Sequence, residues 1–141
     1  MKRNQLFLAV IALFAVVLLN ACSKNEGKGL RKLTYKVSGD VTVPVTVQYT
    51  PTITDPNETD FSDYNYEETI TSLPWEKTVS LHQYASGGGL SVSVEDAVPG
   101  TSLTLKIFEG SEEKATKTVV VNGNGWIDNG LLNYYFPEFN M

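Results

Sequence analysis

The sequence contains very few of the side chains on which catalysis and metal binding usually depend. Among its 141 residues there is one cysteine, Cys22, and one histidine, His82. A zinc site of the usual kind needs several Cys or His ligands, and no recognisable nucleophile motif accompanies His82. We therefore expect no metal site, no cofactor and no enzymatic activity. His82 is expected to be a structural or surface residue, with a role as a general base or ligand as the alternative.

After residue 21, acidic side chains outnumber basic ones. Residues 22–141 carry nine basic and 16 acidic side chains, a net charge of −7. A surface of this sign repels the phosphate backbone, so we expect no nucleic-acid partner. A chain of 120 residues forms one domain and is long enough to bury a core.

Only one long hydrophobic run is present, and it lies near the amino terminus. Leu6 to Leu19 is unbroken and apolar, and Lys2 and Arg3 precede it. As a helix, these 14 residues would span roughly 21 Å, which is shorter than the ~30 Å hydrocarbon core of a bilayer. The run therefore predicts the hydrophobic region of a secretion signal rather than a permanent membrane span.

The residues after this run resemble the lipobox of bacterial lipoproteins, with Ala21 directly before Cys22. The resemblance implies cleavage after Ala21 and attachment of diacylglycerol to the Cys22 sulfur. Ser23 follows where lipoproteins of the inner membrane often have Asp, which favours an outer-membrane anchor facing the periplasm or the cell surface. The alternative is a secreted protein with one free thiol. We expect a signal peptide at 1–21 and the lipidated cysteine with a flexible tether at 22–30.

The composition of the remaining chain favours strands. Residues 22–141 contain 12 Val and 14 Thr but only three Ala, and β-branched residues suit a pleated surface. Apolar and polar residues alternate from Leu33 to Ser38 and again from Val41 to Thr50. Gly39-Asp40 between them predicts a tight hairpin turn, and Pro44 predicts that the second strand lies at a sheet edge.

Five further strands are expected, separated by turn signals. They cover residues 67–72, 78–82, 90–94, 103–107 and 114–121. With no helical stretch, this pattern indicates an all-β antiparallel sandwich of about seven strands. We place the sandwich domain at 31–125 and a C-terminal aromatic tail at 126–141.

The run Leu73-Pro74-Trp75 resembles the MmpS family of small transport-accessory proteins, which have an immunoglobulin-like β-sandwich. Segments resembling that family occur in family order from about Leu33 to Val121. The resemblance implies an immunoglobulin-like fold and a partner that is an envelope transporter. The chain differs from the known members of that family, which have a transmembrane anchor and commonly a late cysteine pair. Pro74, Trp75 and Gly39 are expected to be structural, with Trp75 a buried anchor between the sheets.

Aromatic side chains are the best indication of a binding surface. They gather in an acidic loop at 51–65 and in the tail, and aromatics on loops suit contacts with sugars or proteins. The candidate binding residues are Phe61, Tyr64, Tyr66, Trp126, Tyr134, Tyr135 and Phe136. The alternative for the tail is that it folds back as an extra strand or covers a sheet edge.

The acidic loop also begins like a calcium-binding loop at Asp55. It lacks the glycine and the final glutamate of an EF-hand, because Asp60 and Tyr66 stand at those positions. A solvated acidic loop is expected, and the alternative is a looser calcium site using Asp55, Asn57, Asp60 or Asp63.

Two functions follow from these features. The first is a lipid-anchored, non-catalytic envelope protein that binds a lipid-like cargo or a protein partner, such as an envelope transporter. The second is a surface module that binds a glycan or acts in adhesion through the loop and tail aromatics. In both, the chain contacts the membrane through Cys22.

Overall fold

A computed structural model of the chain describes residues 29–55 and 66–139. These residues form eight strands and one short 3₁₀ helix. In chain order they are β1 (Leu30–Gly39), β2 (Val45–Tyr49), β3 (Tyr66–Ile70), β4 (Trp75–His82), β5 (Gly87–Val94), β6 (Ser102–Glu109), β7 (Glu112–Val120), β8 (Leu131–Tyr135) and η1 (Pro137–Phe139).

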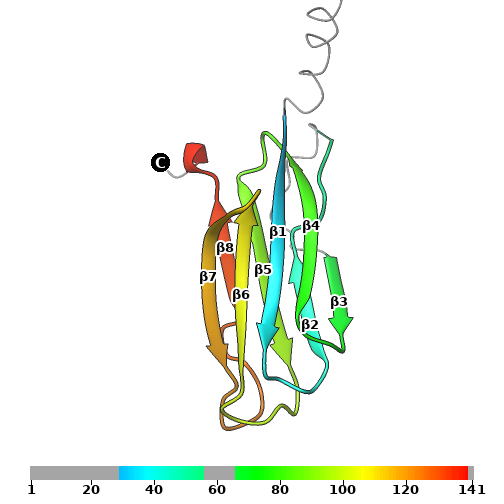
Figure 1. Ribbon diagram of the computed structural model, residues 1–141, viewed down its shortest axis with the longest axis vertical. Helices are drawn as coiled ribbons and strands as arrows, with labels where there is room; N and C mark the ends of the chain where they lie inside the picture. The colour runs from blue at the N-terminus through cyan, green and yellow to red at the C-terminus, as the bar shows by residue number, and fades with distance from the viewer. Residues whose placement is uncertain (1–28, 56–65, 140–141) are drawn as a thin grey trace, which may run out of the picture.

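The strands form two antiparallel sheets of four strands each, packed face to face (Figure 1). The first sheet has the order β4-β1-β6-β7 and the second has the order β3-β2-β5-β8. The predicted all-β sandwich is therefore confirmed.

The connection between β1 and β2 differs from the prediction. Gly39-Asp40 does not form a hairpin, because β1 and β2 belong to different sheets. Gly39 still pairs with Leu103 of β6, and a Cβ atom at this position would collide with the Ser102 carbonyl oxygen. The Asp40 carboxylate accepts a hydrogen bond from the Ser102 amide at 2.6 Å, after which the chain crosses to the second sheet.

Pro44 does not mark a sheet edge either. It directly precedes β2, which begins at Val45 and lies between β3 and β5. Because Pro44 stands before the first paired residue, its missing amide donor removes no hydrogen bond from the ladder.

The C-terminal tail is part of the sandwich. It folds back as an extra strand, which was the alternative prediction for this segment. β8 pairs with β5 from Leu131↔Ser91 to Tyr135↔Gly87 and forms an edge of the second sheet. The glycines of β5 permit this close pairing, since a Cβ atom on Gly87 would collide with the Tyr134 carbonyl oxygen. The sandwich thus continues beyond residue 125, to the end of β8.

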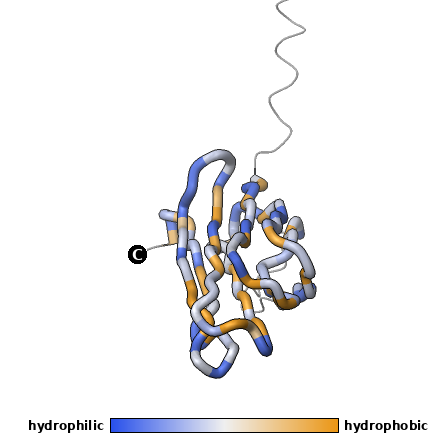
Figure 2. The backbone as a smooth tube through the Cα atoms, turned by 60° about the horizontal axis from the view of Figure 1, so that its bottom comes forward, coloured by the Kyte–Doolittle hydropathy of each residue, from blue (hydrophilic) through white to orange (hydrophobic). Residues whose placement is uncertain are grey.

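The core lies between the sheets and follows the alternation along the strands. Figure 2 shows apolar and polar stretches interleaved along the chain. The largest fully buried side chains include Tyr35, Tyr49 and Phe136. The Tyr35 hydroxyl donates a hydrogen bond to the Thr50 carbonyl oxygen at 3.2 Å, which satisfies its polar atom inside the core.

The two ends of the sandwich carry different parts of the chain (Figure 1). At one end, β1 begins next to the β4–β5 turn and η1, and we call this the tether end (residues 29–31, 83–86 and 137–139). The opposite end, the tip, consists of the loops 40–44, 95–101 and 121–130. In the described ranges the structure has no helix with the length and apolarity needed to cross a membrane.

Candidate ligand-binding site

The outer face of the second sheet carries a row of hydroxyl groups close to the tip. Thr46 of β2 pairs with Thr69 of β3 on one side and with Ser93 of β5 on the other. Their neighbours in each strand, such as Val45, Val47 and Val94, are buried in the core. Because side chains alternate across a strand, the three hydroxyls lie on the same outer face.

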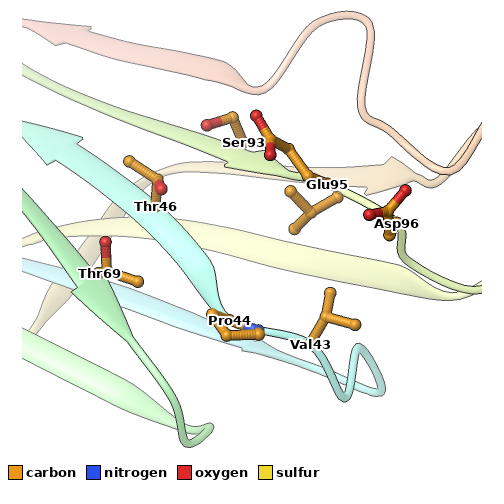
Figure 3. A pocket seen from close by; sticks show the side chains of 8 residues that line it. Val43, Pro44, Thr46, Thr69, Ser93, Glu95 and Asp96 are labelled. Atoms are coloured by element: carbon orange, nitrogen blue, oxygen red, sulfur yellow. The ribbon is translucent and has the colours of Figure 1, made fainter.

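A pocket of about 410 Å³ lies over this row. It is lined by Val43, Pro44, Thr46, Thr69, Ser93, Val94, Glu95 and Asp96. Figure 3 shows the side chains coming from three neighbouring strands and from the loops that adjoin them. The pocket thus combines apolar side chains with three hydroxyls and two carboxylates.

The charge of the pocket is negative. Glu95 and Asp96 both line the pocket, and none of the described residues around it is a lysine, arginine or histidine. Carboxylates accept hydrogen bonds and repel anions. The pocket therefore suits a neutral or cationic ligand that carries hydrogen-bond donors.

The backbone at Asp96 is held in an uncommon conformation. Its φ of 53° lies in the left-handed region, which Asp tolerates better than most residues. The next residue, Ala97, donates its amide hydrogen to the Gly125 carbonyl oxygen at 3.0 Å. This contact places the Asp96 end of the pocket beside the β7–β8 loop.

That loop presents Trp126 on a backbone held by several hydrogen bonds. The Asn122 side-chain oxygen accepts hydrogen bonds from the amides of Asn124 (2.9 Å) and Trp126 (3.3 Å), and the Asn122 amide donates to the Trp126 carbonyl oxygen (2.8 Å). The Asn122 side-chain nitrogen donates to the Asp128 carboxylate at 2.9 Å. The Trp126 residue nevertheless remains 52% exposed. A loop restrained by several internal hydrogen bonds loses less entropy on binding, which suits its exposed indole to contact with a ligand.

Two exposed valines lie on the neighbouring segments of the tip. Val98 is 60% exposed in the β5–β6 turn, and Val120 is 57% exposed at the end of β7. The two segments are joined by hydrogen bonds between the backbones of Gly100, Thr101 and Val121. The tip therefore carries apolar surface in addition to the polar pocket.

Tyr66, the one predicted loop aromatic within the described residues, lies at a lateral edge of the sandwich. Its ring centroid is 5.3 Å from that of Tyr49, and the Trp75 ring lies 5.6 Å from Tyr49 on the opposite sheet. The indole nitrogen of Trp75 donates to the Glu68 carboxylate at 2.9 Å. Trp75 is half-buried where the two sheets meet, so it packs on the core at its margin rather than enclosed within it.

Lys77 completes this edge. Its amino group lies 5.7 Å from the Tyr49 ring centre and 5.8 Å from that of Tyr66. The side-chain hydrogen bond with Tyr49 raises the pKa of Lys77, and burial raises the pKa of the Tyr49 hydroxyl. Charged side chains that point inward on edge strands prevent pairing with another sheet, so this cluster has a structural explanation.

The predicted residues of the tail have three different environments. Phe136 is fully buried and is a core residue. Tyr134 faces inward at the β8 edge, where its hydroxyl donates to the Glu109 carboxylate at 3.0 Å. Tyr135 is half-exposed on the outer face of the second sheet, and it pairs with Gly87 at the tether end, far along β5 from the pocket. The candidate aromatics therefore do not form one site.

The remaining candidate residues lie away from the pocket or outside the described residues. His82 ends β4, and its Nδ1 accepts a hydrogen bond from the Tyr84 amide at 3.4 Å. Cys22, Phe61 and Tyr64 lie outside the described residues, as do Asn57, Asp60 and Asp63 of the calcium alternative. Within the described part of the chain, no three side chains of Asp, Glu, His or Cys gather in a way that could hold a metal ion.

Glu95, Asp96 and the hydroxyl row were not among the residues predicted from the sequence. The signal that could have found the two carboxylates is that they are adjacent and come directly after an expected strand, separated by two residues from Pro99-Gly100. Comparisons with known protein families and with curated proteins find no match to this chain.

Proposed function

We propose that this chain is a lipid-anchored, non-catalytic binding protein of the cell envelope, and that the tip pocket binds a neutral oligosaccharide. The anchor is the lipidated Cys22, in the outer membrane. A glycan ligand is the alternative that the aromatic content of the sequence indicated. Of the aromatic residues predicted to bind it, the proposed site keeps only Trp126.

The observation that carries the proposal is the composition of the pocket and its neighbourhood. Hydroxyls of Thr46, Thr69 and Ser93 and the carboxylates of Glu95 and Asp96 line one cavity of about 410 Å³. The loop that presents Trp126 contacts the chain at Ala97, directly after Asp96. Sugars offer many hydroxyl donors and an apolar ring face, which carboxylates and an exposed indole complement.

The charge of the pocket predicts which sugars bind. An acidic sugar would bring a carboxylate close to Glu95 and Asp96, and no basic side chain among the described lining residues would offset the repulsion. We therefore expect neutral glycans to bind and uronic-acid or sialic-acid glycans not to bind.

The test is a glycan array probed with the chain from Ser23 onward, which retains every described residue. The matched variants are Asp96→Asn, which keeps the side-chain shape and tolerates the positive φ, and Trp126→Ala. We expect each to weaken binding of neutral glycans by about tenfold or more, as loss of a charged hydrogen bond or of a stacking contact predicts.

Tyr66→Ala provides the control, because Tyr66 is similarly exposed but lies at the lateral edge. It should leave glycan binding unchanged. Equal losses in all three variants, or an absence of neutral glycans among the bound set, would refute the oligosaccharide site. The anchor is tested separately by Cys22→Ser, which should abolish incorporation of labelled fatty acid into the protein; undiminished labelling would refute the anchor.

A second candidate function is favoured by the exposed valines of the tip. Val98 and Val120 offer aliphatic surface that a sugar does not require, and protein interfaces use such surface around an aromatic anchor. The partner would be an envelope protein such as the transporter implied by the MmpS resemblance. A photo-crosslinking residue at Val98 should then capture one reproducible partner in intact cells, whereas the same residue at Glu76, on the outer face of the first sheet, should not.

A further inference from the structure

The tether end carries apolar side chains exposed to solvent. Leu30 at the start of β1 is 45% exposed, Tyr84 in the β4–β5 turn is 59% exposed, and Phe139 at the end of η1 is 44% exposed. They come from three segments that are distant in sequence and meet at the same end of the sandwich (Figure 1).

Two of these side chains line the same hollow. A cavity of about 560 Å³ is bordered by Gly29, Leu30, Arg31, Gln83, Tyr84 and Glu138. Its single basic group is already engaged, because Arg31 pairs with Glu138 at 2.7 Å and with Glu109 at 3.8 Å. The Arg31 guanidinium also lies 4.1 Å from the centre of the buried Phe136 ring. The tether end therefore combines exposed apolar and aromatic side chains with an arginine that is already paired to carboxylates.

We propose that the tether end rests against the lipid surface, with Leu30, Tyr84 and Phe139 at the level of the headgroups. This inference depends on the lipid anchor of the proposed function. Tyrosine and other amphipathic aromatics are enriched where protein meets the membrane interface.

The length of chain between anchor and domain supports a lipid surface as the occupant. Leu30 follows Cys22 by eight residues, which span at most about 28 Å when fully extended. A domain confined so close to the bilayer meets it at a high effective concentration, so weak apolar contacts suffice to orient it. With the tether end on the membrane, the tip and its pocket point away from it.

The experiment uses the full lipidated protein reconstituted in vesicles of phosphatidylethanolamine and phosphatidylglycerol. A single thiol is introduced by Tyr84→Cys or Phe139→Cys and labelled with an environment-sensitive fluorophore. Because Cys22 is the only cysteine of the chain and its sulfur is acylated, the label attaches only to the new thiol. Val98→Cys is the matched control, since Val98 is as exposed as Tyr84 but lies at the tip.

Quenching by lipids spin-labelled in the headgroup region should reduce the emission at positions 84 and 139 at least about twofold, because interfacial groups lie within the reach of such quenchers. The label at position 98 should be unaffected. Equal quenching at both ends, or quenching at the tip alone, would overturn the inference.

The two proposals fail in distinguishable ways. If Cys22 carries no lipid, no variant floats with the vesicles, and both the lipid anchor and the membrane contact of the tether end are refuted. If the protein floats but labels 84 and 139 are unquenched, only the membrane contact is refuted. Labels that are shielded in intact cells yet unquenched in vesicles would indicate a protein at the tether end, which also contradicts a lipid surface.

Discussion

Trp126 and Phe136 lie ten residues apart in the same aromatic-rich segment, and the fold uses them in opposite ways. Phe136 is fully buried directly after β8, whereas Trp126 is half-exposed on the loop before that strand. The loop holds its shape through Asn122, and β8 holds its shape through pairing with β5. The comparison teaches that aromatic content alone does not separate a core contact from a binding contact.

The largest effect should come from Phe136→Ala. Removing a fully buried phenyl ring leaves a cavity, and the free energy of unfolding should fall by about 3–5 kcal/mol. Urea denaturation followed by circular dichroism measures the loss. The neighbouring Tyr135→Ala, at a half-exposed residue, should cost less than about 1 kcal/mol; similar losses in both variants would contradict the division between core and surface.

Gly88→Val should have the next largest effect. Gly88 pairs with Tyr134, and a Cβ atom on it would press on the Tyr35 hydroxyl and on Leu33. Overpacking of this kind costs about 1–3 kcal/mol. Thermal unfolding would measure the loss, and Gly123→Val, at a glycine with open space around it, is the control expected to remain near the wild-type midpoint.

Asn122→Ala tests whether the loop presents Trp126 as a fixed unit. The substitution removes three side-chain hydrogen bonds, and we expect stability to fall by about 1–2 kcal/mol. Glycan binding should weaken together with it, although Asn122 does not line the pocket. Normal affinity in a variant with a mobile loop, judged by hydrogen exchange, would show that Trp126 needs no fixed position.

Alkaline pH should produce the smallest change in the free energy of unfolding, spread over a broad pH range. Burial, aided by the hydrogen bond to Glu109, raises the pKa of Tyr134, and burial raises that of Tyr49. A raised pKa means that the folded state retains its proton longer than the unfolded state, so this contribution is complete below pH ~10 and falls as the pH rises further. Tyr134→Phe should therefore flatten the decline in the urea midpoint between pH 9 and about 11; an unchanged slope would contradict the assignment.

Strands β1 and β2 were predictable because each follows a two-residue alternation of apolar and polar residues, which is typical of a half-buried strand. Leu33, Tyr35 and Val37 are all fully buried, as their alternation indicated. The same alternation could not show whether β1 and β2 lie side by side or face to face, since both arrangements bury the same residues. The hairpin predicted at Gly39-Asp40 was wrong for that reason.

The last strand and the pocket could not be read from local pattern. In β8, Leu131 and Leu132 are adjacent, as are Tyr134 and Tyr135, so only the register with β5 decides which of them faces inward. The pocket likewise depends on register, because Thr46, Thr69 and Ser93 meet only when three strands are paired. Long-range pairing of this kind has no signature within a single segment.

The position of β1 has a mechanical consequence. It lies in the interior of the first sheet, with antiparallel partners β4 and β6 on its two sides, and the chain enters it at Leu30, at the end opposite the tip. A pull between the membrane and an object held at the tip would run along β1. Because ladder hydrogen bonds are perpendicular to their strands, that force would act on both ladders in shear, so that many bonds resist together rather than opening one after another. A sandwich anchored through β1 would therefore resist tension along its long axis.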